Sequence, residues 1–208
     1  MFSTILVLAP HTDDGELGCG GSIARFVEQE YNVHYVAFST ARTSVNDEFP
    51  DNILEIEVKK ATKVLGIPRE NLIISDYSVR HFPKHRQEIL EDLIEIKETI
   101  DPDLVLTPSP NDIHQDHQVI AQESLRAFKR HTILGYEQPW NNIVFETKNF
   151  ILLKESHIEK KVEALKCYES QKHRSYLGEE FIWSLAKTRG TQIEGGYAEA
   201  FEVLRWVL

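Results

Sequence analysis

Two short polar stretches contain the residue types in this chain that are best suited to catalysis. The first, residues 11–16, contains a histidine followed by the adjacent carboxylates Asp13 and Asp14. The second, residues 111–117, lies much later in the chain and contains two histidines among carboxylates. Each stretch follows an apolar run that is typical of a buried strand. Because open α/β proteins place their chemistry in loops at the carboxyl ends of parallel strands, we expect the two stretches to face one another.

These residue types predict a metal site with a base beside it. Catalytic zinc sites use three protein ligands, typically His with Asp or Glu, and keep one position open for water. His11 and Asp14 are separated by a short turn, so that both reach one ion, and we expect His117 to supply the third ligand. Asp13 is then next to a ligand but free, and is predicted to take a proton from the attacking water as a general base.

The second stretch also contains a pair with a different predicted role. His114, with Asp116 near it in sequence, is predicted to be an oriented, positively biased imidazole that faces a developing oxyanion. A plainer alternative is that Asp13 or Asp14 caps the N-terminus of the following helix, and that the second stretch is polar surface. The occurrence of both stretches directly after core strands favours the metal site.

A nucleotide-binding loop is the competing interpretation of the glycines that follow the first stretch. Residues 18–21 are Gly-Cys-Gly-Gly, but Ile23 stands where a dinucleotide fingerprint needs its third glycine. The second predicted strand ends in Ser39 with no acid to bind a ribose, and no Walker-type lysine follows. Close packing of a helix on the sheet explains these glycines more simply.

Apolar periodicity predicts the elements that position the two stretches. Strands and helices alternate over the first 130 residues, which is the pattern of a parallel, doubly wound sheet, and the alternation weakens afterwards. We therefore predict an α/β fold, a Rossmann-like three-layer sandwich with a mostly parallel sheet, in one domain over residues 1–208. The predicted strands cover about residues 4–9, 33–38, 72–74, 104–106, 132–136, 150–153 and 201–207. The predicted helices cover about residues 15–30, 86–100, 117–129, 156–168 and 178–187, with a further helix ending at residue 65.

Composition narrows the class of protein. An apolar share of 41% and a charged share of 27% indicate an ordered globular chain, and a net charge of −10 argues against nucleic acid or an anionic membrane as the main partner. Two distant cysteines, Cys19 and Cys167, do not make a disulfide framework. We see neither a signal peptide nor a run that spans a bilayer, and we expect a cytoplasmic protein.

The motif His-Thr-Asp-Asp-Gly-Glu, followed later by Asp-Ile-His-Gln-Asp-His, resembles the LmbE-like, PIG-L de-N-acetylase family. The similarity extends to residues 100–105 and to residues 197–201. That family removes acetyl groups from N-acetylglucosamine conjugates. Two departures stand out: Thr12 replaces the usual proline, and residues 39–44 lack the Thr-x-Gly-Glu type segment of many relatives. The second departure weakens any transfer of substrate specificity.

The resemblance implies the same roles as the chemistry does. It assigns His11, Asp14 and His117 to zinc, makes Asp13 the base and His114 the polarising or acid histidine, and makes Asp116 its orienting partner. Fe²⁺ or another divalent metal suits the same ligands. For substrate binding we single out four residues. Arg42 and Arg189 offer fork-like donors, and Arg189-Gly190 resembles a family position, whereas Tyr136 follows a predicted strand and Tyr197 lies in the resembling tail.

The resulting hypothesis is a zinc-dependent hydrolase that removes the acetyl group from an N-acetylglucosamine-type sugar or conjugate. Its partner is then a small molecule, and family members are often homo-oligomers, so a homo-oligomer is a further expectation. Two alternatives stay open at this point. One is a metal-dependent amidase that acts on a non-sugar amide; the other is a non-enzymatic protein that binds sugar or metal.

Overall fold

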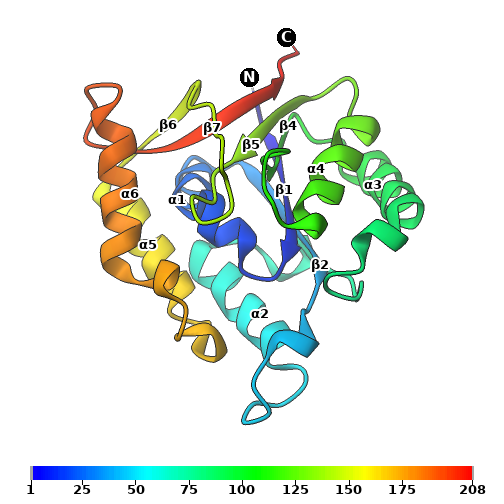
Figure 1. Ribbon diagram of the computed structural model, residues 1–208. Helices are drawn as coiled ribbons and strands as arrows, with labels where there is room; N and C mark the ends of the chain where they lie inside the picture. The colour runs from blue at the N-terminus through cyan, green and yellow to red at the C-terminus, as the bar shows by residue number, and fades with distance from the viewer. Residues whose placement is uncertain (1, 208) are drawn as a thin grey trace.

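The computed structural model describes residues 2–207 and forms three layers, with a central sheet between two layers of helices (Figure 1). The strands are β1 (Thr4–His11), β2 (Asn32–Ser39), β3 (Leu72–Ile74), β4 (Leu104–Pro108), β5 (Thr132–Tyr136), β6 (Asn149–Leu153) and β7 (Tyr197–Arg205). The helices are α1 (Asp14–Glu28), α2 (Ile53–Leu65), α3 (Arg86–Ile100), α4 (Gln115–Ala127), α5 (Glu155–Leu165) and α6 (Glu179–Thr191).

The sheet is mostly parallel, as predicted. Its order is β3-β2-β1-β4-β5-β7-β6, and the first five of these strands pair in parallel. β7 pairs with β5 and with β6, and both of these pairings are antiparallel. The chain leaves β1 towards β2 and later returns to β4 on the other side of β1. A crevice therefore opens between the loops that follow β1 and β4, which is where open α/β sheets bind ligands.

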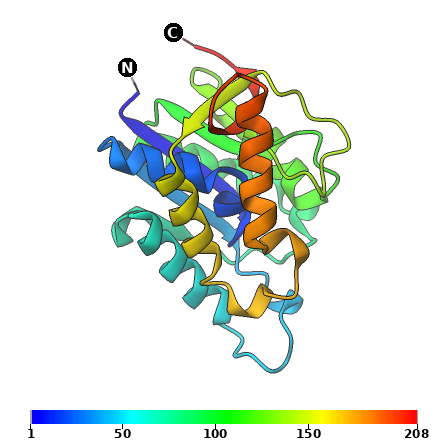
Figure 2. The same ribbon diagram turned by 90° about the vertical axis from the view of Figure 1, so that its left-hand side faces the viewer.

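Side-chain alternation along β1 builds both halves of the core. Ile5, Val7 and Ala9 pack on the face covered by α1, α2 and α5, while Leu6 and Leu8 pack on the face covered by α3 and α4. Figure 2 shows α1, α5 and α6 in front of the sheet. All of these β1 side chains are fully buried, so β1 is held rigidly. The loop that follows β1 therefore starts from a fixed point. Within residues 2–207, no helix is long and apolar enough to cross a membrane.

The glycines of α1 serve packing, as the sequence suggested. A Cβ atom on Gly18 would overlap the ring of Tyr136 in β5, so only glycine lets the helix approach the sheet this closely. The helix is also kinked, because Cys19 has non-helical backbone angles (φ −146°, ψ 24°). The kink interrupts the helical hydrogen bonds and leaves polar backbone groups that need other partners.

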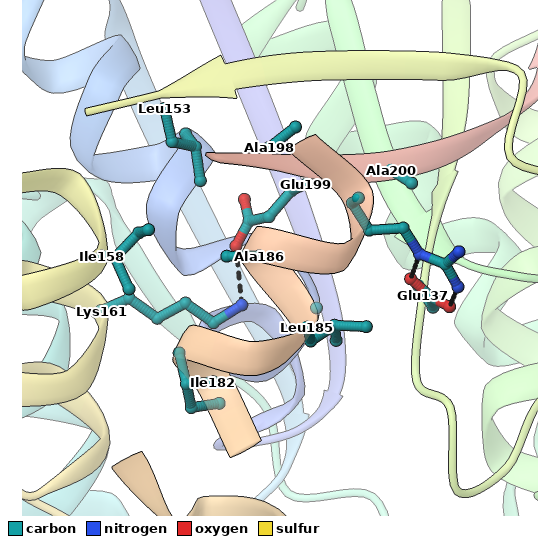
Figure 3. A pocket seen from close by; sticks show the side chains of 12 residues that line it. Glu137, Leu153, Ile158, Lys161, Ile182, Leu185, Ala186, Ala198, Glu199 and Ala200 are labelled. Carbon is teal, nitrogen blue, oxygen red and sulfur yellow. Dashed lines mark hydrogen bonds and ion pairs between the residues drawn. The ribbon is translucent and has the colours of Figure 1, made fainter. Parts of the chain in front are cut away.

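A buried ion pair, Lys161 with Glu199, supplies those partners. The Glu199 carboxylate accepts hydrogen bonds from the backbone N–H groups of Gly21 (3.0 Å) and Ser22 (2.7 Å). Lys161 Nζ donates to the Leu17 carbonyl (2.7 Å) and to Glu199 (2.6 Å). Figure 3 shows the pair beside α6, where both residues line a cavity of about 20 Å³. The pair therefore holds both halves of α1, the helix that begins with Asp14.

Replacing Lys161 with methionine is expected to lower the free energy of unfolding by about 3–5 kcal/mol, because the buried Glu199 charge loses its counter-ion. Urea denaturation followed by circular dichroism measures the change. Lys160→Met is the matched control, because Lys160 is exposed on the same helix and its loss should change stability by about 0.5 kcal/mol or less. Equal effects of the two substitutions would contradict this account of the kink.

Candidate active site

A cavity of about 410 Å³ opens at the crevice between the loops after β1 and β4. Five of the predicted site residues line it: His11, Asp13, Asp14, His114 and His117. His11 ends β1 and Asp14 begins α1, so both are fixed by regular structure rather than by a free loop. His117 lies in the first turn of α4, and His114 is the N-cap residue of that helix. The fold thus brings the two polar stretches together across the crevice.

Three side-chain atoms meet at the floor of this cavity. Asp14 Oδ2 lies 3.1 Å from His11 Nδ1 and 3.2 Å from His117 Nε2, and the two ring nitrogens lie 3.3 Å apart. A tetrahedral ion bound at about 2.0 Å would hold its ligand atoms roughly 3.3 Å from one another. The three edges of this triangle therefore fit a metal ion. The ring nitrogens of His11, His114 and His117 also lie within 4.8 Å of one another, which is a looser arrangement.

Two carboxylates orient the rings of the close triangle. Asp112 Oδ2 lies 2.8 Å from His117 Nδ1, and Asp116 Oδ2 lies 3.1 Å from His11 Nε2. Each carboxylate accepts the N–H of one ring nitrogen, so the lone pair of the other nitrogen points at the triangle. A carboxylate that holds the far nitrogen of an imidazole in this way is the usual support of a metal-binding histidine. Asp112, to which the sequence reasoning assigned no role, stands directly in the second polar stretch.

The predicted partner of Asp116 was wrong. Its carboxylate supports His11 and accepts the backbone N–H of Arg80 (2.6 Å), and only its own backbone N–H contacts His114, at Nδ1 (3.2 Å). The reason is geometric: as the second residue of α4, Asp116 is directed towards β1 while His114 caps the helix behind it. Proximity in sequence did not reveal this direction.

The charges of the triangle favour a bound cation. Burial opposes a charge on His117, but Asp14 and Asp112 raise the pKa of its imidazole to about 10. Buried carboxylates on both sides thus stabilise positive charge at this point, and a divalent cation supplies it more directly than a proton does. The donor set of two imidazoles and one carboxylate is one that zinc accepts.

Asp13 faces the cavity without a structural task for its carboxylate. It occupies the N-cap position of α1, yet its side chain makes no capping hydrogen bond. Burial, with the charge of Asp14, raises the pKa of Asp13 to about 6. This value is close to what a general base at neutral pH requires. The plain capping role for Asp13 is therefore wrong.

His114 is a neutral hydrogen-bond donor, not the positively biased group that the sequence suggested. Burial, with repulsion from His117 and His11, lowers the pKa of its imidazole to about 4. Its Nδ1 accepts the backbone N–H of Asp116, so its proton lies on Nε2. A neutral imidazole N–H of this kind stabilises an oxyanion by donating a hydrogen bond.

Two buried tyrosines hold the loop that contains Asp13. The hydroxyls of Tyr35 and Tyr168 lie 2.9 Å and 2.6 Å from the carbonyl oxygen of Thr12. Both hydroxyls also contact the carboxyl group of Glu16, which is fully buried. Burial raises the pKa of Glu16 to about 8 although the tyrosine hydrogen bonds lower it. The loop is thereby fixed from below by groups on β2 and beyond the end of α5.

The outer wall of the cavity comes from two segments to which the sequence analysis assigned no role, one after β5 and one between α5 and α6. Trp140 and Tyr176 stack with ring centroids 4.1 Å apart and planes 7° apart. Arg174 contacts the Tyr176 hydroxyl, donates to Gln171 Oε1 (2.6 Å), and forms no salt bridge within residues 2–207. An arginine beside stacked aromatic rings suits a polar ring-shaped ligand. No local pattern marks these residues, because they meet only through packing.

Comparison with known proteins identifies the family. Residues 6–128 match the PIG-L family, described as GlcNAc-PI de-N-acetylase. The chain belongs to the PIG-L family. It is 31% identical to the uncharacterized deacetylase YaiS of Escherichia coli (strain K12) over 172 residues, which is 80% of this chain and 90% of YaiS. The resemblance seen in the two motifs is thus confirmed.

Solved structures share the fold at lower identity. The N,N'-diacetylchitobiose deacetylase from Pyrococcus horikoshii superimposes with a TM-score of 0.82 at 21% identity, covering 98% of this chain and 84% of its own. GalB of Pseudomonas putida KT2440, a 4-carboxy-2-hydroxymuconate hydratase, superimposes with a TM-score of 0.79 at 21% identity, covering 99% and 98%. Because a hydratase and a deacetylase share this architecture, the fold by itself does not identify the reaction.

The four residues predicted to bind substrate lie outside the cavity that contains His11 and Asp14. Tyr136 is fully buried and donates to the Leu8 carbonyl (2.9 Å), and Arg189 forms a two-pronged ion pair with Glu137. Arg42 pairs with Asp76 (3.2 Å) beside a neighbouring cavity, and Tyr197 packs against Trp183. None of these four side chains lines the cavity that holds Asp13 and His117, and each makes a packing contact, a hydrogen bond or an ion pair outside it. Figure 3 shows Glu137 on the opposite side of α6 from Lys161.

Proposed function

We propose that this protein is a metal-dependent hydrolase that removes the acetyl group from an N-acetylglucosamine-type sugar or conjugate. The observation that supports it most is the close triangle of His11, Asp14 and His117 beside the unengaged carboxylate of Asp13, in an open cavity. The description of the family and the name of the Pyrococcus horikoshii enzyme support the choice of substrate class.

His11, Asp14 and His117 are the proposed ligands, with zinc as the expected metal and Fe²⁺ as an alternative. When bound, such a cation polarises the acetyl carbonyl and lowers the pKa of water. We prefer this set to one that includes His114 because its three atoms lie closer together, and because carboxylates orient both rings. Asp112 and Asp116 then orient the metal ligands His117 and His11 rather than bind the substrate.

Asp13 and His114 are the proposed catalytic residues. Asp13 takes a proton from the water that attacks the acetyl carbon, and His114 Nε2 donates a hydrogen bond to the carbonyl oxygen as negative charge develops there. When the carbon–nitrogen bond breaks, the proton held by Asp13 is available to the leaving amine. Acetate and a free amino sugar are then the products, with one water consumed.

Acetate release from a panel of N-acetylglucosamine derivatives tests this function. The purified protein is assayed as prepared, after treatment with a chelator, and after zinc is added back. We expect release to stop with the chelator and to return with zinc. Release only from N-acetylated compounds that are not sugars would show that the proposed substrate class is wrong and that the protein acts on a non-sugar amide. Saturable sugar binding with no release under any condition would contradict an enzymatic role.

A further inference from the structure

Gln138 has a buried amide oxygen with no hydrogen-bond partner, although every other polar group of this residue has one. The residue follows β5, is 1% exposed and lines the cavity that holds Asp13 and Asp14. Its backbone N–H donates to Asn142 Oδ1 (2.6 Å), and its carbonyl accepts the backbone N–H groups of Asn141 and Asn142 (both 2.9 Å). Its Nε2 donates to Asp14 Oδ1 (2.9 Å). Within residues 2–207, Oε1 is the one polar atom of Gln138 that has no hydrogen-bond partner.

The orientation of the Gln138 amide follows from its neighbour. Asp14 Oδ1 is a carboxylate oxygen and can only accept, so the amide must present its NH₂ group to it. The oxygen is therefore the free end, and the hydrogen bonds to Asn141 and Asn142 hold the backbone of the residue. An unpaired buried acceptor destabilises the folded protein. A residue held this firmly with such an acceptor is suited to receive a donor from a ligand.

We propose that Gln138 Oε1 accepts a hydrogen bond from the N–H of the scissile acetamide. This inference rests on the proposed function, in which Asp13 takes a proton from the attacking water and His114 donates a hydrogen bond to the carbonyl oxygen. The N–H is the one remaining polar group of an acetamide, and it requires an uncharged acceptor that is not consumed by proton transfer. Held by Gln138, the amide nitrogen keeps its orientation as water adds to the carbon.

The consequence is discrimination between amides and esters. An ester of the same shape has no N–H, so it leaves Gln138 Oε1 unpaired in the cavity. Sites that are built to hydrogen-bond a substrate N–H or O–H reject analogues that lack it for this reason. A purely structural Gln138, which only supports Asp14, would treat the two substrates alike.

The test compares N-acetylglucosamine with glucose that is O-acetylated at the same carbon, using the zinc-loaded protein and Gln138→Met. We expect Gln138→Met to lower kcat/KM for the amide by roughly 10- to 100-fold more than for the ester. Both substrates are assayed on one preparation, so any loss of zinc or of folded protein cancels in the ratio. Asp112→Asn is the matched control: it weakens the support of His117, as Gln138→Met weakens that of Asp14, and should lower both rates equally.

An equal loss for amide and ester in Gln138→Met would overturn this inference. The failure of the proposed function looks different, because the parent protein would then release acetate from neither sugar. In that case nitroacetanilide and nitrophenyl acetate replace the two sugars as the matched amide and ester. The loss of kcat/KM for the amide, divided by the loss for the ester, then tests the role of Gln138 on a non-sugar amide.

Discussion

Replacing Asp13 with asparagine is expected to lower kcat by about 100- to 10,000-fold while the bound metal is retained. The physical reason is that asparagine keeps the shape of the side chain but cannot take a proton from water. The carboxylate of Asp13 makes no capping hydrogen bond to α1, so the substitution leaves the start of that helix intact. Acetate release and elemental analysis of the same sample give the two readouts.

The control for this substitution is Asp51→Asn, which changes an exposed aspartate outside the cavity and should leave kcat unchanged. Asp13→Asn with the parent kcat would show that the base is another group. Loss of metal in Asp13→Asn would instead make Asp13 a ligand and would shift the proposed set away from Asp14.

Replacing His117 with alanine is expected to abolish stoichiometric metal binding, and activity with it. The substitution removes one corner of the triangle and leaves Asp112, which is 1% exposed, without the imidazole that it contacts at 2.8 Å. Zinc at about 100 times its dissociation constant stabilises a folded protein by roughly 2.7 kcal/mol. We therefore expect zinc to raise the Tm of the parent protein but not that of His117→Ala, as measured by calorimetry with and without chelator.

A graded comparison sharpens this prediction. Asp112→Asn keeps the ligand and removes only the charge that orients it, so zinc affinity should fall by about 10- to 100-fold rather than vanish. His81→Ala, which removes an exposed histidine outside the cavity, should have no effect on zinc binding. A full equivalent of zinc in purified His117→Ala would rule out the triangle as the metal site.

Local patterns predicted the architecture well because they depend on short-range physics. Apolar alternation along β1 and the helical periodicity of α3 are properties of neighbouring residues, and they imply strands and helices wherever those residues lie. The position of both polar stretches after core strands then placed them at one edge of a parallel sheet. The α/β fold with a mostly parallel sheet is confirmed, and so is the family.

Element ends were less accurate where tertiary contacts decide them. The last strand was predicted over residues 201–207 but is Tyr197–Arg205, because it pairs with β6 along residues 197–201. No local sequence pattern indicates that pairing. The predictions of a single domain, a homo-oligomer and a cytoplasmic location stay predictions.

The directions of side chains and the far wall of the cavity depended on the tertiary structure. Asp116 supports His11 across the crevice rather than its sequence neighbour His114, and Gln138 reaches Asp14 from the end of another strand. Arg189, chosen because Arg189-Gly190 resembles a family position, forms an ion pair with Glu137, whereas Arg174 reaches the cavity from the segment between α5 and α6. Residue types and short spacings determined which chemistry this protein contains. Packing between elements that are distant in sequence decided which side chains contact one another. The physical reason is that each of these contacts forms only when the whole chain has folded around the sheet.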